Sequence, residues 1–274
     1  MRHAIRSAAL AAALAILLIG STATARADDT AWKAAHDTDP HLPLTAEQVE
    51  MTAEKRTAEP REDAGGLAPA FDPFMVCASC GGGGGGYPTS AHLVANQKAQ
   101  TTSYYCGPAS VHEALGSVGV SLSQAAAATK LHTTTGGTAW SGGGTSPSGY
   151  PVPDVMNGNQ KRNYYVPQPV PSASSDAIST YKGDLKVDIY SVRAPLIGDA
   201  WEVPGGPHLV GHPANREIFH WFEIRGYDNS GGSTMYEDSV HGASSISWSG
   251  NVPAYSTLAS STIVTIVSGR GYVW

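Results

Sequence analysis

The sequence predicts an α+β fold, in which a helical first half of a domain packs against an antiparallel sheet formed by the second half. In the first half, apolar residues recur at helical spacing after capping residues. In the second half, strand-like segments at 220–227 and 233–237 flank a turn sequence. Because the helices precede the strands and do not alternate with them, an antiparallel sheet is favoured over a parallel one.

The N-terminus has the pattern of a secretory signal peptide over residues 1–27. A short basic head ends at Arg6, an apolar run covers 8–19, and residues 25–27 (Ala-Arg-Ala) offer a cleavage site with small flanking side chains. The apolar run is too short for a membrane span, and no later segment is long and apolar enough for one. We therefore expect an exported, secreted or extracellular protein without a membrane anchor after cleavage.

The charge of the chain argues against nucleic acid or anionic lipid as its main partner. The formal net charge is −6 at pH 7. Cleavage after Ala27 removes Arg2, Arg6 and Arg26 and no acid, which changes that charge from −6 to −9. An acidic protein of this kind gains nothing from the phosphate contacts that dominate binding to nucleic acid.

Residues 28–87 are expected to form an N-terminal arm that precedes the domain at 88–274. A capping box, Thr45 with Gln48, predicts a helix that ends at about Thr57. The chain then becomes rich in Gly, Pro and Ala and ends in six consecutive glycines, a composition typical of a flexible linker. The arm is either a pro-segment that is removed or a spacer.

The domain shows a succession of predicted elements. A helix opens at Cys106 and ends near Gly116, and a capping box of Ser121 with Gln124 predicts a second one to about Leu131. A long loop at 133–149 and short helices at 153–158 and 175–183 follow; strands are predicted at 187–192, 220–227, 233–237 and 261–267, with a hairpin turn at 228–232.

The three cysteines divide into a close pair and a single residue. Cys77 and Cys80 are free to form a disulfide outside the cytoplasm, which leaves Cys106 as an odd thiol available for chemistry. A redox or metal role for the pair is the alternative. A redox motif should open a helix, whereas a glycine run follows this pair; a zinc site would need partners, for which His208 and His212 alone have suitable spacing.

Cys106 lies in a sequence that favours an activated thiolate. At a helix N-terminus, unpaired backbone N–H groups lower the pKa of a thiol. Gly107 allows a substrate to approach closely, and Pro108 is tolerated in the first turn. Gln100 lies upstream, where its amide could form an oxyanion hole with the Cys106 backbone N–H. The alternative is a structural cysteine at a helix start and a surface glutamine.

His220 is the best candidate base for that thiol, since it begins a strand of the expected sheet and the other nine histidines do not. The turn at 228–232 places positions 220–222 opposite 238–240, so Asp238 falls beside His220 and could orient its ring. Glu237 should face the other side of its strand. The alternatives are a packed histidine and an ordinary strand-end carboxylate.

The motif around Cys106 (Tyr-Cys-Gly-Pro-Ala-Ser) and that at 220–228 (His-Trp-Phe-Glu-Ile-Arg-Gly-Tyr-Asp) resemble papain-like cysteine peptidases. They are most similar to the bacteriocin-processing, double-glycine peptidase-like family, in its free-standing secreted form. The resemblance covers about 93–268. It implies Cys106 as nucleophile, His220 as base, Asp238 as orienting acid and Gln100 in the oxyanion hole. The family often has Asp-Pro where Ser239 follows Asp238 here.

Three classes of function follow from these observations. The first is a peptidase that cleaves amide bonds of a peptide or protein substrate through a thioacyl-enzyme, with no cofactor. The second is an acyltransferase of the transglutaminase type, which uses the same residues and passes the acyl group to an amine. The third is a binding domain on the same fold, with an inert thiol. The four groups in the expected order favour an enzyme.

Overall fold

The computed structural model describes residues 32–33, 35–37, 39, 42–57, 86–142 and 146–274, and it confirms the α+β class. Its helices and strands are α2 (Ala46–Thr57), β1 (Ala91–His92), α3 (Cys106–Ser117), α4 (Gln124–Lys130), α5 (Pro151–Asn159), β2 (Pro167–Pro169), α6 (Ser175–Lys186), the π-helix η1 (Val187–Val192), β3 (Leu196–Glu202), β4 (Ile218–Asp228), β5 (Ser233–Glu237), β6 (Tyr255–Ala259), α7 (Ser260–Val267) and β7 (Gly271–Val273), with single 3₁₀ turns at Asn229–Gly231 and Ser249–Asn251. The predicted signal peptide and the Cys77–Cys80 pair lie outside the described residues.

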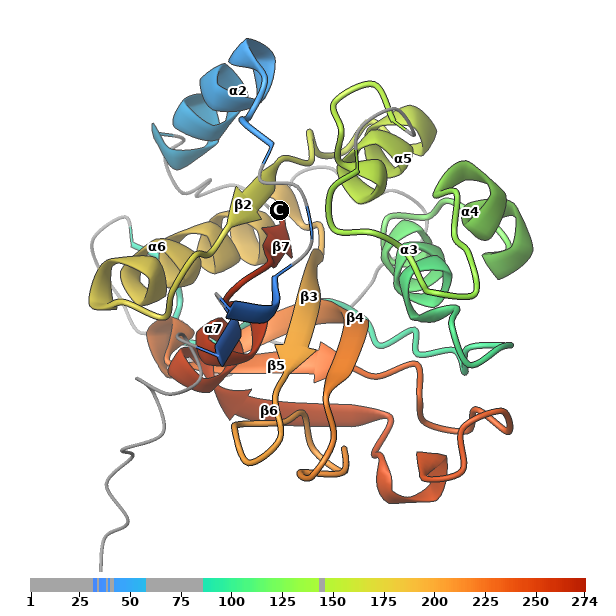
Figure 1. Ribbon diagram of the computed structural model, residues 1–274. Helices are drawn as coiled ribbons and strands as arrows, with labels where there is room; N and C mark the ends of the chain where they lie inside the picture. Colours follow the sequence, from blue (N-terminus) through green and yellow to red (C-terminus); the bar gives the residue numbers. More distant parts are fainter. Residues whose placement is uncertain (1–31, 34, 38, 40–41, 58–85, 143–145) are drawn as a thin grey trace, which may run out of the picture.

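The strands form one antiparallel sheet in the order β2-β7-β3-β4-β5-β6, and β1 pairs with β4 off this path. Helices cover both sides of the sheet, as Figure 1 shows: α3, α4 and α5 lie on one side, and α6 and α7 lie on the other. No helix in the described part of the chain is long and apolar enough to cross a membrane.

Alternation along the central strands gives each side of the sheet its own core. Ile197 and Trp221 join the cluster that contains α3 and α5, whereas Leu196 and Phe222 join the cluster beneath α6 and α7. Successive side chains of a strand point to opposite faces, so a central strand covered on both faces is buried throughout. β3 is buried at every position, which explains why it lacks the polar alternation of an exposed strand.

The helices predicted from capping residues are present, with one change of cap. Thr45 and Gln48 bond reciprocally, Thr45 N to Gln48 Oε1 at 2.9 Å and Gln48 N to Thr45 Oγ1 at 3.2 Å, and so form the predicted capping box of α2. α4 begins later than predicted, because Ser123 is its cap and accepts a hydrogen bond from Ala126 N. α5 and α6 extend the two short helices that were expected.

Two predicted strands are wrong. Residues 187–192 continue α6 as a π-helix, and residues 261–267 form most of α7. Both segments are rich in β-branched residues, whose helix propensity is only slightly unfavourable. In α7 the buried residues Ile263, Val264 and Val267 pack into the core at helical spacing, so tertiary packing outweighs the local preference. Strands β1, β2, β3, β6 and β7 were not predicted.

The described part of the N-terminal arm packs against the domain. Lys55 on α2 pairs with Asp188 on η1 at 2.9 Å, and Arg56 pairs with Asp184 on α6 at 2.7 Å. Closer to the N-terminus, the ammonium group of Lys33 donates to the Thr265 carbonyl at the end of α7. These polar contacts hold segments of the arm on the surface formed by the second half of the chain.

Candidate active site

Cys106 is the first residue of α3, as predicted. The first intrahelical bond runs from Ala109 N to Tyr105 O, so the N–H groups of Cys106 and Gly107 have no partner within the helix. A side chain at Gly107 would collide with Thr138, which shows why this position is glycine. The Cys106 side chain is buried, at 8% exposure, and is a free thiol.

The His220 ring lies close enough to Cys106 for its charge and hydrogen bonding to act on the pKa of the thiol. Burial opposes ionisation of the thiol, but the hydrogen bond and charge of His220, with backbone N–H groups of Trp221 and Gly107, lower the pKa of Cys106 below its ordinary value. Conversely, burial disfavours a charged ring, yet the charge and hydrogen bond of Asp238 and the contact with Cys106 raise the pKa of His220 well above its ordinary value. The pair therefore favours thiolate and imidazolium.

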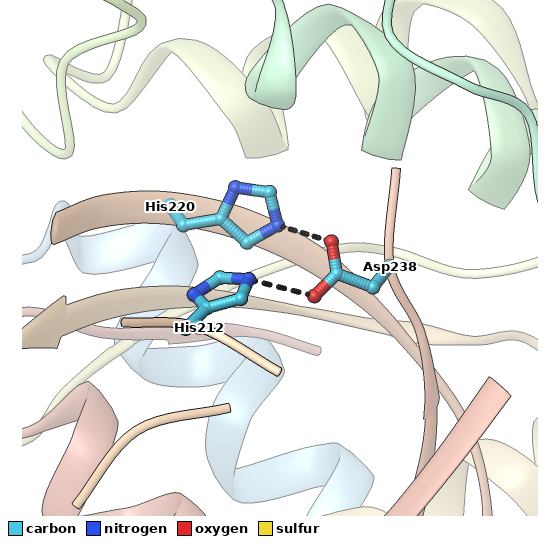
Figure 2. A group of neighbouring side chains, drawn as sticks. All are labelled: His212, His220 and Asp238. Carbon is cyan, nitrogen blue, oxygen red and sulfur yellow. Dashed lines mark hydrogen bonds and ion pairs between the residues drawn. The ribbon is translucent and has the colours of Figure 1, made fainter. Parts of the chain in front are cut away.

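Asp238 faces the Nε2 atom of the His220 ring (Figure 2), with Oδ1 at 3.0 Å from that nitrogen. The same oxygen accepts a hydrogen bond from Val240 N at 2.9 Å. Burial alone would raise the pKa of Asp238, but the contacts with His220 and His212 lower this pKa below its ordinary value. Asp238 therefore stays ionised. Since Nε2 faces Asp238, Nδ1 is the ring nitrogen of His220 that remains for Cys106.

The hairpin register that suggested Asp238 agrees with the structure. Glu223 on β4 pairs with Glu237 on β5, and a bulge after Ile224 shifts the register towards the turn. The turn itself uses left-handed backbone at Asn229 and Ser230. Glu237 turns away from His220 and accepts a hydrogen bond from Asn96 N, as alternation along the strand requires.

His212 is a second histidine on the same carboxylate, and it was not chosen as a site residue from the sequence. Its Nε2 lies 3.0 Å from Asp238 Oδ2 and its Nδ1 lies 2.8 Å from Glu202 Oε2 (Figure 2 shows the first contact). Glu202 in turn accepts a hydrogen bond from Leu209 N. The buried side chains therefore form a chain from Cys106 through His220, Asp238 and His212 to Glu202.

The donor atoms of His212, His220 and Asp238 lie within 4.8 Å of one another, a spacing that could also hold a metal ion. In the structure, each of the two histidines already directs a ring nitrogen at an oxygen of Asp238. Hydrogen bonds therefore already occupy these ring nitrogens and carboxylate oxygens. We interpret His212, His220 and Asp238 as a hydrogen-bonded network that holds protons.

Gln100 is buried near the site, but its observed contacts position the loop before α3. Its Nε2 donates to the Thr102 carbonyl at 2.8 Å, and its Oε1 accepts from Ser239 Oγ at 3.2 Å. No hydrogen bond between Gln100 and Cys106 occurs among the described residues. Gln124 supports the same loop by bonding Thr101 N and the Ala99 carbonyl. The oxyanion-hole role of Gln100 stays a prediction.

A pocket of about 320 Å³ opens beside the thiol. Its lining is partly aromatic and partly charged and includes Cys106, Trp140, Asp199, Phe219, Trp221 and Arg270, together with Asp39 from the arm and the loop at 134–139. Gly136 and Gly137 lie on that loop, and a Cβ atom at either position would meet no close contact. Asp199 was also missed from the sequence; the available signal was a pair of acids, Asp199 and Glu202, in an otherwise apolar segment.

No protein-family model matches the chain, and a search of curated proteins finds no significant match.

Proposed function

We propose that this protein is a secreted cysteine peptidase of papain-like design, with Cys106 as nucleophile and His220 as base. The observation that carries the proposal is the contact of a buried thiol at a helix start with an imidazole that Asp238 holds from the other side. A nucleophile, a base and an orienting group in hydrogen-bond reach are the requirements for covalent catalysis by a thiol.

In this proposal the Cys106 thiolate attacks the carbonyl carbon of a peptide bond, while the proton of the thiol resides on His220. The imidazolium then gives that proton to the leaving amine, and a thioester remains on Cys106. Water attacks the thioester, His220 takes a proton from that water, and the thiolate departs with the carboxylic acid product released. Asp238 remains ionised throughout and stabilises the imidazolium.

The oxyanion that forms in each step needs hydrogen-bond donors near the sulfur. The unpaired Cys106 N–H at the start of α3 is one candidate, and Gln100 is the second that the proposal assigns. The adjacent pocket gives a peptide access to the thiol and has room for one substrate side chain.

The test is the pH dependence of iodoacetamide alkylation of Cys106 in the chain from residue 28, followed by peptide mass spectrometry. An assembled pair predicts fast alkylation well below the ordinary thiol pKa of about 8.5, and loss of this acidic reactivity in His220→Ala. His241→Ala is the matched control, because the His241 ring bonds the Val252 carbonyl. A profile that rises only near pH 8.5 and ignores His220→Ala would refute the proposal.

A further inference from the structure

Asp199 is a largely buried carboxylate that lines the pocket of the nucleophile. It lies on β3 opposite Trp221 of β4, is 4% exposed, and lines the pocket that contains Cys106. No hydrogen bond from a described residue reaches its carboxylate. By contrast, the buried acids Asp184, Asp188 and Asp238 all accept hydrogen bonds. Buried polar groups are nearly always paired, so an unpaired one that faces a pocket points to a ligand.

The described charged groups at the pocket are two acids, Asp39 and Asp199, and one cation, Arg270. Arg270 is the cation that lines it, and its guanidinium is paired with Asp37 at 2.8 Å and Asp39 at 3.3 Å. It also stacks over the ring of Trp201, 4.4 Å from the centroid. Both arm carboxylates contact Arg270, whereas Asp199 forms no hydrogen bond or ion pair with any of the described residues.

The walls of the pocket suit a long side chain with a cationic end. Trp140 and Trp221 stack at 5.9 Å between ring centroids, and Phe219, which is 50% exposed, adds a third aromatic ring at the lining. Aromatic faces attract ammonium and guanidinium groups and pack against methylene stems. A cavity of about 320 Å³ has room for a side chain of this size.

We propose that Asp199 is a specificity-determining residue that binds the cationic end of a lysine or arginine side chain of the substrate. The inference rests on the proposed peptidase function and names its substrate class. A lysine or arginine held there would lie between the aromatic walls, with its charged end at the Asp199 carboxylate and its peptide backbone near Cys106.

The protonation of Asp199 gives this recognition a pH dependence. Burial raises the pKa of Asp199 well above its ordinary value, Arg270 and His220 act against this, and the charges of Cys106 and Asp39 add to it. A bound cation stabilises the ionised form, so binding displaces a proton from Asp199. Preference for a cationic side chain should therefore strengthen as the pH rises.

The test uses charged thiol reagents, which need no known substrate. Rates of Cys106 modification are measured with a trimethylammonium-ethyl, a sulfonato-ethyl and a neutral methyl methanethiosulfonate, each divided by its rate with N-acetylcysteinamide. We expect the cationic reagent to exceed the anionic one by on the order of 10-fold in the native chain from residue 28. In Asp199→Asn this preference should fall to near the free-thiol ratio. Asp176→Asn, an exposed acid on α6, is the control for the same change in net charge.

The neutral reagent separates failure of this inference from failure of the peptidase proposal. If the neutral reagent reacts rapidly in both proteins but charge has no effect, or the anionic reagent is preferred, the Asp199 inference is overturned and the activated thiol stands. If even the neutral reagent reacts with the native protein only as fast as with a free thiol, the peptidase proposal fails as well. In each protein the charged reagents are compared with the neutral reagent, so a change in the reactivity of Cys106 caused by Asp199→Asn itself cancels from the charge preference.

Discussion

His212 donates to the Asp238 carboxylate on the oxygen opposite the one that faces His220, so one buried acid is held between two imidazole rings. The other ring nitrogen of His212 faces Glu202. A neutral ring carries one N–H, and would therefore direct a lone pair at an oxygen of one of these acids. Burial disfavours the cation, but Asp238 and Glu202 raise the pKa of His212 above its ordinary value. The geometry thus favours a protonated His212.

The first prediction concerns His212 as a positioning residue. His212→Leu removes one of the donors that fix Asp238, and we expect the alkylation rate of Cys106 at pH 6 to fall by about 10- to 100-fold, as for other residues that orient a reactive group. Glu202→Gln should retain most of the rate, because a glutamine amide can donate to a neutral His212 whose Nε2–H still bonds Asp238. Rates measured from pH 5 to 9 test both variants.

The pH profile distinguishes positioning from a merely structural role. Because the pKa of His212 is raised, its network is intact at low pH and is lost as the pH rises through that pKa. The contribution of this network to the alkylation rate of Cys106 should therefore disappear at alkaline pH in the native protein. It should not disappear in Glu202→Gln. His241→Gln is the control. Equal pH profiles for the native protein and His212→Leu would leave His212 without a role in the site.

The second prediction concerns Gln100. If its amide stabilises an oxyanion, Gln100→Ala should slow acylation of Cys106 by p-nitrophenyl acetate by about 100- to 1,000-fold. Alkylation by iodoacetamide forms no oxyanion and should change little. Gln124→Ala, which loosens the same loop through Ala99 and Thr101, is the comparison. A parallel loss of both reactions in Gln100→Ala would instead mean that Gln100 only supports the loop.

The position of Cys106 at a helix start and the contact of His220 with Asp238 could be predicted because their evidence is local. Cys106 opens a helix in a recognisable sequence, and the turn at 228–232 determines the hairpin register, which brings Asp238 to His220 by counting along two adjacent strands. Such short-range pairing depends on turn chemistry and side-chain alternation alone.

The remaining parts of the site depend on contacts between distant segments. Glu202 and Asp199 belong to β3, a strand buried on both faces and therefore without a periodic signal. His212 lies in a loop between β3 and β4 and meets Asp238 only through the tertiary fold. For the same reason α7 was mistaken for a strand, since its β-branched composition says nothing of the core against which it packs.

The third prediction concerns three buried carboxylates, Glu113, Glu223 and Glu237. Burial raises the pKa of Glu237 to about 7, and burial with the charge of Glu237 raises the pKa of Glu223 well above its ordinary value. A raised pKa stabilises the fold below the ordinary value and loses that contribution as the pH rises through the folded value. We therefore expect the melting temperature to fall between pH 5 and pH 8.

Glu223→Gln should reduce this fall, because glutamine can still accept the hydrogen bond from Ser117 and cannot ionise. Glu54→Gln, an exposed residue of α2, is the matched control. Melting curves of the three proteins at pH 5, 6.5 and 8 test the expectation. A native melting temperature that rises from pH 5 to pH 8, or an identical slope in Glu223→Gln, would contradict it.

The fourth prediction concerns the docking of the arm by Lys55. The Lys55 ammonium lies 2.9 Å from Asp188 Oδ1 and 4.2 Å from the centroid of the Trp274 ring. Lys55→Met keeps the apolar stem but leaves Asp188 buried without its cation, a change that typically costs about 3–5 kcal/mol. Lys55→Met/Asp188→Asn should recover part of this loss, since no unpaired charge is then buried. Urea unfolding at pH 8 measures the differences.

The cost of Lys55→Met should depend on pH in a definite direction. Burial raises the pKa of Asp188 to about 6 even with Lys55 present, and removal of that cation favours the neutral acid further. At pH 5 Asp188 can therefore be buried as a neutral group, and the variant should be closer in stability to the native protein than at pH 8. Lys130→Met, at an exposed position on α4, controls for loss of a lysine. A Lys55→Met variant as stable as the native protein at pH 8 would mean that α2 is not held by this pair.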